Sequence, residues 1–475
     1  MRRARIICTL GPASGSPQMI ERLVRAGMDV ARLNMSHGTH EDHRKYIRAV
    51  RAAGRKLGRP VAVLLDLQGI KIRIGEVNGE QVLLKKGSRV LLRAGDRQSN
   101  AETLYISCPS LARDLKKGHR VLLDDGLMEL VVTGRQGDAL VTDVREGGFL
   151  SSRKGVNLPD SHVSARSFTT KDQEDLAFGL SEDVDAVAIS FVTSESDILA
   201  LKSRLRQAQS TITVIAKIEK PAALDRIEAI LDVSDGIMVA RGDLGVEMPA
   251  YTVPITQKDL IRRANRKQKL VITATQMLES MRQSPVPTRA EAADVANAVL
   301  DGSDAVMLSG ETSVGRHPVR VVRTMAQLVE ETERTGHSFS AGLPSPEPVF
   351  GTDVDRTSFA VADAAVGAAA DLGARCIVAL TKTGYTASLI AKFRPTVPII
   401  ACTSDRKVIR RMKLLWGVTP QYIKPLSGTD ALIREVERVL KTHGYSKRGQ
   451  DVVLTASIPL GIDGKTNFLK VHRVG

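Results

Sequence analysis

Residues able to bind a metal ion and an anion lie close together between Val214 and Glu247. Lys217 and Glu219 are two positions apart at the end of an apolar run, so on a strand their side chains point to the same side. A lysine there is costly unless a carboxylate or an anionic ligand accompanies it. Glu219 and Asp243 offer two hard oxygen ligands, which suits Mg²⁺ because this ion completes its shell with water and substrate phosphate. The alternative is a structural ion pair.

The run Ala240 to Gly245, read as ARGDLG, favours the binding site over the structural pair. Its glycines allow backbone N–H groups to approach an anion where a helix begins. The segment therefore predicts chemistry on small phosphorylated molecules.

Eight short apolar segments are each followed by a longer amphipathic stretch. They read ARIICTL, DVARLNM, VAVLLDL, DAVAISF, TVIAKIE, DGIMVA, LVITAT and DAVML. This number closes a (β/α)8 TIM barrel, in which catalytic groups lie at the carboxyl ends of the strands. The polar residues that end these segments are therefore expected to face one cavity. They are Arg32, Asn34, Ser36, Asp66, Lys217, Glu219, Asp243, Thr275, Ser309 and Glu311.

Two other units interrupt and follow the barrel pattern. Between Asp66 and Lys171, short segments alternate apolar and turn residues, which predicts an inserted all-β domain that closes over the active-site face as a lid. Ser338 to Gly351 predicts a linker, and the segments RCIVALT, VPIIACT, VTPQYI, DVVLTA and LKVHRV predict a smaller doubly wound α/β domain. We expect barrel residues 1–69 and 167–340, a β-barrel lid over 70–166, and a C-terminal α/β regulatory domain over 345–475.

A formal charge of +15 favours anionic partners. The densest basic run, Arg262 to Lys269, has no aromatic residue, and the chain has one tryptophan, so base-stacking platforms are lacking and we expect no nucleic acid partner. Four cysteines without a CxxC pair argue against a zinc site and for a reducing compartment. No signal segment or long apolar run is present, so we expect a cytoplasmic protein without membrane contact.

Eight stretches, in order, resemble pyruvate kinases along the whole chain. They are CTLGPAS (8–14), RLNMSHG (32–38), KGVNLP (154–159), AKIEKP (216–221), DGIMVARGDLGVE (235–247), ATQMLESM (274–281), PTRAEAADVANAV (287–299) and MLSGET (307–312). The resemblance implies transfer of the phosphoryl group of phosphoenolpyruvate to ADP, giving pyruvate and ATP in glycolysis. Positioning and charge stabilisation dominate such a reaction.

The resemblance also implies roles for individual residues. Glu219 and Asp243 would hold a divalent ion, Mg²⁺ or Mn²⁺, and Lys217 would stabilise the transition state. Arg32 would clamp phosphoryl oxygens with its planar fork. The substrate carboxylate would be held by Thr275, also a candidate for the proton relay, and by the backbone of Gly242 and Asp243.

Two cations at the roots of the insertion, Arg73 and Lys154, match positions that contact nucleotide phosphates in the family. On their own they would read as solvated surface cations. Their placement favours a lid that closes over ADP or ATP.

A monovalent-cation site is implied at Asn34, Ser36, Asp66 and the backbone carbonyl of Leu67. Here the chain departs from the common pattern, because it reads LDLQGIKIR where LDTKGPEIR is usual, which puts Lys71 in place of a glutamate. A tethered ammonium replaces the charge of a potassium ion, so we expect that K⁺ is not required. Other departures are SARSFTTKD after the insertion and Val286, whereas Thr288 and Glu291 keep a capping-box pattern.

The stretch TKTGYT follows a predicted strand and opens a predicted helix. Its residues Thr381, Lys382, Thr383, Gly384 and Thr386 either bind phosphate or form a capped turn. The resemblance favours an effector site, since regulated pyruvate kinases bind effectors at this loop. Lys465 is the single cation of the loop LGIDGKTN that offers a second grip, so a sugar monophosphate or AMP fits at least as well as a bisphosphate. A homotetramer is the family expectation.

Two other functions remain open at this point. A Mg²⁺-dependent enolate lyase or aldolase also uses a Glu and Asp metal pair on a barrel, but it leaves Arg73, Lys154 and the insertion unexplained. A catalytically inactive metabolite sensor or RNA-binding protein predicts a damaged metal or lysine position, yet Lys217, Glu219 and Asp243 are all present.

Overall fold

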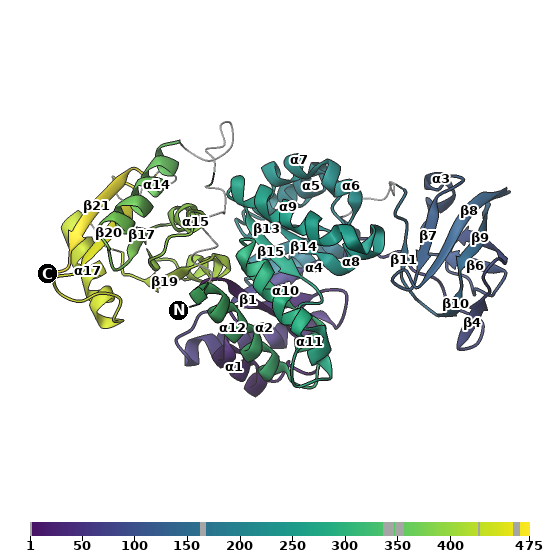
Figure 1. Cartoon of the computed structure of the whole chain (residues 1–475), viewed down its shortest axis with the longest axis horizontal. Coiled ribbons are helices and arrows are strands. Elements are labelled where there is room, and N and C mark those ends of the chain that lie inside the picture. The colour runs from purple at the N-terminus through teal and green to yellow at the C-terminus, as the bar shows by residue number, and fades with distance from the viewer. Residues whose placement is uncertain (1, 162–167, 336–345, 347–355, 426–427, 459–465) are drawn as a thin grey trace.

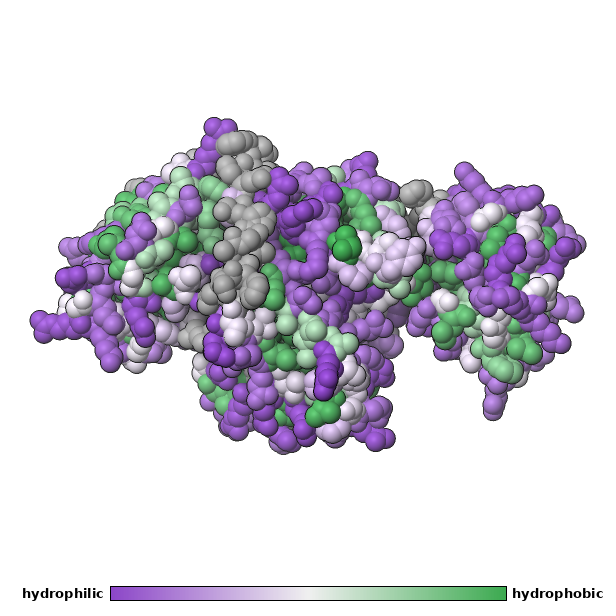
Figure 2. Space-filling model, in the orientation of Figure 1, coloured by the Kyte–Doolittle hydropathy of each residue, from purple (hydrophilic) through white to green (hydrophobic). Residues whose placement is uncertain are grey.

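The computed structural model describes residues 2–161, 168–335, 346, 356–425, 428–458 and 466–475. Three parts lie in a row, with a central barrel, the insertion on one side and the C-terminal unit on the other (Figure 1). Hydrophilic residues dominate the visible face of all three parts, and the molecule narrows between the barrel and the insertion (Figure 2). The predicted linker, Ser338 to Gly351, lies almost entirely outside the described residues.

The eight predicted barrel strands all form and close into one parallel sheet, which confirms the predicted fold class. Around the barrel, the order is β1, β2, β3, β12, β13, β14, β15, β16. Their bounds are β1 Arg5–Thr9, β2 Val30–Asn34, β3 Ala62–Asp66, β12 Ala186–Ile189, β13 Thr213–Ile218, β14 Gly236–Ala240, β15 Leu270–Ala274 and β16 Ala305–Leu308. These strands are buried along nearly their whole length, as expected where helices cover one face and a packed interior covers the other.

Helices alternate with these strands and cover the outside of the barrel. They are α1 Pro17–Ala26, α2 His40–Lys56, α4 Thr170–Ser181, α5 Glu195–Gln207, α6 Pro221–Asp225, α7 Ile227–Val233, α8 Arg241–Glu247, α9 Val253–Arg266, α10 Arg289–Leu300, α11 Gly310–Ser313 and α12 Pro318–Thr335, with the 3-10 turns η1 Ala250–Thr252 and η2 Glu279–Arg282. The predicted capping box of Thr288 and Glu291 begins α10. The basic run at the end of α9 is a solvated face, since Arg262, Arg263 and Lys267 pair with nearby carboxylates.

The insertion is a separate β unit with its own apolar core. Its strands are β4 Gln81–Leu84, β5 Arg89–Ala94, β6 Thr103–Ile106, β7 Arg120–Leu123, β8 Met128–Gln136, β9 Ala139–Glu146, β10 Gly148–Ser151 and β11 Val156–Asn157, with one short helix, α3 Leu111–Asp114. Six strands form one sheet in the order β11-β7-β8-β9-β5-β6, and β10 pairs with β4. At the root of the insertion, the N–H of Gly69 donates to Asp172 Oδ1 at 3.0 Å, which ties the entering chain to the helix that follows the return.

The C-terminal unit is the predicted doubly wound α/β unit. Its five strands are β17 Ile377–Leu380, β18 Ile399–Thr403, β19 Val418–Tyr422, β20 Asp451–Ala456 and β21 Phe468–Arg473, in the sheet order β19-β18-β17-β20-β21. β21 alone runs antiparallel. Its helices are α14 Arg356–Asp371, α15 Tyr385–Lys392, α16 Arg406–Arg411 and α17 Thr429–Thr442, with the 3-10 turn η3 Met412–Leu414. Separate apolar clusters cover the two sheet faces.

The C-terminal unit closes the amino-terminal end of the barrel. Leu414 belongs to the same buried cluster as the inward-facing Ile7, Val30 and Met238. Buried charges add to this contact, because Asp304 of the barrel pairs with Lys392 at 2.5 Å and Arg394 at 2.9 Å. The domain boundaries at residues 69, 166 and 340 stay predictions.

Replacing Asp304 with asparagine is expected to lower the free energy of unfolding by about 3–5 kcal/mol, since it leaves buried cations unpaired. Burial opposes ionisation of Asp304, but Lys392 and Arg394 hold its pKa below the ordinary value. The unfolded chain therefore binds more protons in acid, and this stabilisation is lost as the pH falls below about 4. Urea unfolding at neutral and acidic pH measures both effects. Asp259→Asn, which breaks half-exposed pairs, is the control; equal losses in the two variants would contradict this account.

No helix in the described part of the chain combines the length and apolar character that crossing a bilayer requires. Cys8, Cys108, Cys376 and Cys402 are all buried free thiols.

Candidate active site

A chain of polar contacts follows the strand order at the carboxyl end of the barrel. Lys217, near the end of β13, places its Nζ 2.8 Å from Glu219 Oε1, 3.3 Å from Asp66 Oδ1 and 2.7 Å from Ser190 Oγ. Asp66 ends β3 and Ser190 follows β12, so three neighbouring strands supply the partners of one ammonium. The side chain of Lys217 is 11% exposed and those of Asp66 and Glu219 are 1% exposed.

Arg32 on β2 extends this chain toward the first strand. Its Nε donates to Asp66 Oδ2 at 2.6 Å and its Nη1 donates to Thr9 Oγ1 at 2.8 Å. Asp66 therefore lies between two cations. The contacts of Arg32 with Asp66 on β3 and Thr9 on β1 fix the orientation of its planar guanidinium group.

The charges of these groups support one another. Burial alone would lower the pKa of Lys217, but Asp66 and Glu219 outweigh it and hold that pKa above the ordinary value. Burial likewise opposes ionisation of Asp66, while Lys217 and Arg32 hold its pKa below the ordinary value. Lys217 is therefore a fixed positive charge at neutral pH.

The positive charge around Glu219 and Asp243 is not sufficient to balance both carboxylates. Burial raises the pKa of both carboxyls, and Lys217 only partly opposes it. The negative charge of Asp243 adds to the rise in the pKa of Glu219. The N–H of Phe191 donates to Glu219 Oε2 at 2.6 Å, whereas no side-chain partner of Asp243 occurs among the described residues. Two hard oxygens that need a cation fit a divalent ion such as Mg²⁺.

No group of three or more His, Cys, Asp or Glu suited to a metal ion occurs in the described ranges. Two carboxylates, with water or substrate in the remaining positions, are a usual ligand set for Mg²⁺ and not for structural Zn²⁺.

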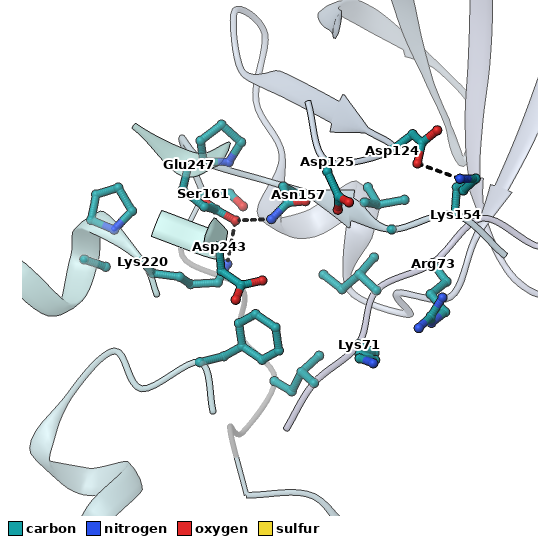
Figure 3. Close-up of a pocket in the computed structure, with 18 of the residues that line it drawn as sticks. Lys71, Arg73, Asp124, Asp125, Lys154, Asn157, Ser161, Lys220, Asp243 and Glu247 are labelled. Atoms are coloured by element: carbon teal, nitrogen blue, oxygen red, sulfur yellow. Dashed lines mark hydrogen bonds and ion pairs between the residues drawn. The ribbon is translucent and has the colours of Figure 1, made fainter. Parts of the chain in front are cut away.

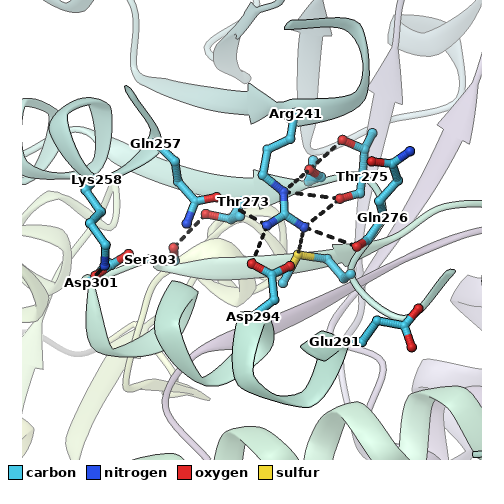
Figure 4. A network of polar contacts seen from close by, with 12 residues as sticks. Arg241, Gln257, Lys258, Thr273, Thr275, Gln276, Glu291, Asp294, Asp301 and Ser303 are labelled. Carbon is cyan, nitrogen blue, oxygen red and sulfur yellow. Dashed lines mark hydrogen bonds and ion pairs between the residues drawn. The ribbon is translucent and has the colours of Figure 1, made fainter. Parts of the chain in front are cut away.

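Thr275 and Gly242 are held together where β15 and β14 end. The N–H of Gly242 donates to Thr275 Oγ1 at 2.7 Å, and this hydroxyl donates to Ala274 O at 2.7 Å. Thr275 and Gln276 have positive φ angles of 66° and 53°, an uncommon backbone state for such residues. Arg241 stabilises this turn by donating to Thr275 O at 2.7 Å, while Asp294 holds the guanidinium at 2.6 Å (Figure 4).

A cavity of about 390 Å³ separates the insertion from the carboxyl end of the barrel (Figure 3). Side chains from both parts line it, among them Lys71, Arg73, Asp124, Asp125 and Lys154 from the insertion and Lys220, Asp243 and Glu247 from the barrel. The expectation that all ten strand-end residues face one cavity is therefore too broad. Asp243 lines this cavity, the Lys217 cluster is buried, and Glu311 instead accepts from the backbone N–H of Leu278 and Ser309.

Arg73 and Lys154 lie next to each other on this cavity. An antiparallel bridge pairs Arg73 with Gly155, and Arg73 Nη1 donates to Arg153 O at 2.6 Å. Lys154 Nζ lies 2.9 Å from Asp124 Oδ1. The two cations come from the entering and returning chains of the insertion, so its movement would carry both of them.

The residues of the implied monovalent-cation site are only partly brought together. Asn34 and Asp66 are register partners on β2 and β3, and Asn34 Oδ1 accepts from the N–H of Ser36 at 3.2 Å. The carbonyl of Leu67 accepts from Ser190 Oγ at 2.7 Å. Lys71 makes no ion pair with Asp66 in the described structure, although the charge of Asp66 acts on its pKa. Burial, followed by Arg73 and Lys217, lowers the pKa of Lys71 to about 8.

The predicted effector loop lies between β17 and α15, as expected. Gly384 has a φ of 94° and its N–H donates to Thr381 Oγ1 at 2.9 Å, while Thr386 Oγ1 lies 2.7 Å from Thr466 Oγ1. The hydroxyl of Thr383 accepts from the N–H of Tyr385 at 3.4 Å. The hydroxyls of Thr381 and Thr383 therefore accept from backbone N–H groups where α15 begins, and a phosphate role stays a prediction. Lys465 lies outside the described residues.

Four residues of this region were missed by the sequence prediction. Thr9 and Ser190 end the first and fourth apolar segments, so the strand-end rule that found Asp66 also applies to them. Arg241 is the second residue of the ARGDLG run and is recognised only by its contacts with the Thr275 turn. Asp125 lies in the tight turn after β7, and its charge raises the pKa of Asp243, which no local pattern indicates.

The closed barrel, the inserted β unit and the charged strand ends define an enzyme of the (β/α)8-barrel class. The family model "Pyruvate kinase, barrel domain" matches residues 1–322, and "Pyruvate kinase, alpha/beta domain" matches residues 359–472. The chain belongs to the pyruvate kinase family.

Individual relatives agree with this assignment over the whole chain. The pyruvate kinase of Sporosarcina psychrophila is 42% identical over 479 residues, covering 100% of this chain and 81% of the relative. That of Staphylococcus aureus strain MRSA252 is 42% identical over 478 residues with the same coverage. The crystal structure of a pyruvate kinase from Cryptosporidium parvum superposes with a TM-score of 0.92 at 34% identity, covering 100% of this chain and 96% of that one.

Proposed function

We propose that this chain transfers the phosphoryl group of phosphoenolpyruvate to ADP, giving pyruvate and ATP in glycolysis. The observation that carries the proposal is the fixed ammonium of Lys217, held by Asp66 and Glu219, together with a cavity that Asp243, Arg73 and Lys154 line. One set of charges serves the phosphoryl donor and the other serves the nucleotide. Phosphoryl transfer needs this kind of positioned charge more than covalent chemistry.

Lys217 and Arg32 are the proposed partners of the transferring phosphoryl group. The ammonium of Lys217 is charged and held in place before substrate binds, so the site needs little reorganisation as negative charge develops on the substrate. Arg32 keeps its guanidinium plane through Asp66 and Thr9 and presents its remaining N–H groups to phosphoryl oxygens.

Glu219 and Asp243 are the proposed ligands of a divalent ion, Mg²⁺ or Mn²⁺. Such an ion supplies positive charge that neutralises substrate oxygens. The raised pKa of both carboxyls supports this role, because a bound cation removes the cost of ionising them.

Thr275 is the proposed contact to the substrate carboxylate, together with the backbone of Gly242 and Asp243. The hydroxyl of Thr275 accepts from the N–H of Gly242 and donates to the carbonyl of Ala274. Because it can both accept and donate a proton, we also infer that it takes part in protonating the enolate. Arg241 is a positioning residue in this scheme, since it acts through the Thr275 turn.

A coupled assay tests the proposal as a whole. Pyruvate formation from phosphoenolpyruvate is expected to require both ADP and Mg²⁺. Turnover without ADP would favour the lyase, and no turnover under any condition would favour the inactive sensor.

Replacing Arg73 and Lys154 with alanine is expected to raise the KM for ADP more than that for phosphoenolpyruvate.

Activity at about pH 7 is expected to be equal with and without K⁺, because the ammonium of Lys71 is then charged. Lys71→Glu is expected to make the activity depend on K⁺. Above about pH 8, wild-type Lys71 loses its proton, and K⁺ is expected to begin to activate. Lys85→Glu, an exposed lysine of the insertion, is the matched control. Strong K⁺ activation of the wild type at pH 7 would contradict the substitution of ammonium for K⁺.

The remaining partners are proposals of the same kind. We infer that the loop with Thr381, Lys382, Thr383, Gly384 and Thr386 binds a phosphorylated effector, a sugar phosphate or AMP. We also infer a cytoplasmic homotetramer without nucleic acid or membrane partners; the four buried free thiols support a reducing compartment.

A further inference from the structure

A second, larger cavity lies at the opposite end of the barrel from the active site. Its volume is about 740 Å³, within the range of small-molecule sites. The walls come from α1, the turn before β2, the chain before β3 and α12 of the barrel, and from β19 and Lys413 of the C-terminal unit. These elements lie around the N-terminus, where the barrel and the C-terminal unit meet (Figure 1).

The lining of this cavity is strongly cationic. Seven arginine or lysine side chains line it, against the two carboxylates Asp29 and Glu330. One of the seven, Arg25, pairs with Glu21 at 2.5 Å, so its charge is balanced locally. The other six form two groups, one at the floor and one at the mouth.

At the floor of the cavity, one carboxylate pairs with three cations. Asp29 lies 2.5 Å from Arg2, 2.9 Å from Lys413 and 3.8 Å from Arg5. Burial lowers the pKa of Lys413, and Asp29 only partly opposes this. The side chain of Arg2 is nine-tenths buried, and its Nη1 has no hydrogen-bond partner among the described residues. A buried donor left in this way is costly, which points to a missing acceptor.

At the mouth, Arg22, Arg59 and Arg323 are exposed and come from three different elements. None of the three side chains makes an ion pair or hydrogen bond within the described structure. Scattered surface arginines are usually solvated, but here they surround a cavity whose floor already has excess positive charge. Arginine guanidinium groups match phosphate oxygens in charge and geometry.

We propose that this cavity is a binding site for a phosphorylated small molecule, separate from the active site and from the loop 381–386. The phosphate lies among the arginines of the mouth, and the polar groups of Gln421 and Tyr445 face the rest of the ligand. A concave site of this size takes a metabolite and not the backbone of a nucleic acid, which needs an extended groove.

The position of the site gives the ligand a structural effect. Because its walls belong to both the barrel and the C-terminal unit, a ligand that contacts both stabilises their docking by mass action. The site lies beside Leu414, which closes the barrel interior, and Lys413 links the two.

Arginine modification with phenylglyoxal, mapped by mass spectrometry, tests the site on the full-length protein. Inorganic pyrophosphate at about ten times its Kd is expected to slow modification of Arg22, Arg59 and Arg323 about tenfold, since only the free fraction reacts. Modification rates of Arg48, Arg206 and Arg289, which are exposed and lie away from the cavity, are expected to stay unchanged. Equal rates at all six arginines with and without pyrophosphate would overturn the proposal.

A pair of triple variants gives a second measurement. R22A/R59A/R323A is expected to weaken pyrophosphate binding at this site by about tenfold or more in titration calorimetry, because charge-assisted hydrogen bonds are lost. R48A/R206A/R289A removes the same charge elsewhere and is expected to bind as the wild type does. Activity without pyrophosphate is expected to be equal in both variants, so the result does not depend on the proposed catalytic function. Equal weakening in the two variants would show a non-specific charge effect and overturn the site.

Discussion

Lys217→Met is expected to lower kcat by roughly 10²- to 10³-fold or more, with a smaller change in the KM for phosphoenolpyruvate. The ammonium is fixed before substrate arrives, by Asp66, Glu219 and Ser190, and its charge is therefore available where negative charge develops. Methionine keeps most of the volume and removes the charge. Steady-state kinetics of the coupled assay measure the effect.

A structural loss has to be separated from this catalytic loss, because the substitution leaves Asp66 and Glu219 without their ammonium. The melting temperature of each variant is measured beside its activity, and Lys217→Arg restores the charge with different geometry. We expect Lys217→Arg to recover thermal stability more fully than kcat. Lys202→Met, which breaks an exposed pair with Asp235, is the control. Retention of more than about a tenth of kcat by Lys217→Met would contradict the proposed role.

Glu219→Gln is expected to lower kcat by roughly 10²- to 10³-fold and to weaken binding of a divalent ion. An amide oxygen has no charge, so the variant loses half of the negative charge offered by Glu219 and Asp243. The neutral amide also cannot balance the positive charge of Lys217. Mn²⁺ binding, followed by electron paramagnetic resonance, separates the loss of the ion from the loss of catalysis.

Glu247→Gln is the matched control for this prediction. Glu247 lines the same cavity as Asp243, but it accepts from Asn157 Nδ2 at 2.9 Å and lies 3.7 Å from Lys220, so it is not part of the proposed metal pair. We expect this variant to bind Mn²⁺ as the wild type does. Wild-type affinity for Mn²⁺ in Glu219→Gln would remove Glu219 from the metal site.

The barrel was predictable because its signal is local. β3, β14 and β15 are buried at every position, and a short, continuous, β-branched run between amphipathic stretches is what such a strand requires. The strand order of the insertion was not predictable from the same signal. Its sheet order β11-β7-β8-β9-β5-β6 depends on pairings between segments distant in sequence, which alternation of apolar residues does not specify.

The candidate site divides in the same way. The pairing of Lys217 with Glu219 follows from a spacing of two on one strand, and the structure brings their charged atoms to 2.8 Å. The contact of Arg241 with the Thr275 turn joins groups that follow β14 and β15, and nothing in either segment alone indicates it. The effect of the Asp125 charge on the pKa of Asp243 likewise depends on how the insertion lies over the barrel.

By itself, the sequence determined the eight strands, the charged residues that end them and the presence of an insertion over them, because strand period and the cost of burying charge act within a few residues. The tertiary structure decided which of these charges are partners. Asp66, expected at a monovalent-cation site, lies between Arg32 and Lys217 because closure of the barrel puts β2, β3, β12 and β13 side by side. The arginine-lined cavity at the other end also exists only in three dimensions, since its cations come from separate helices, turns and two structural units.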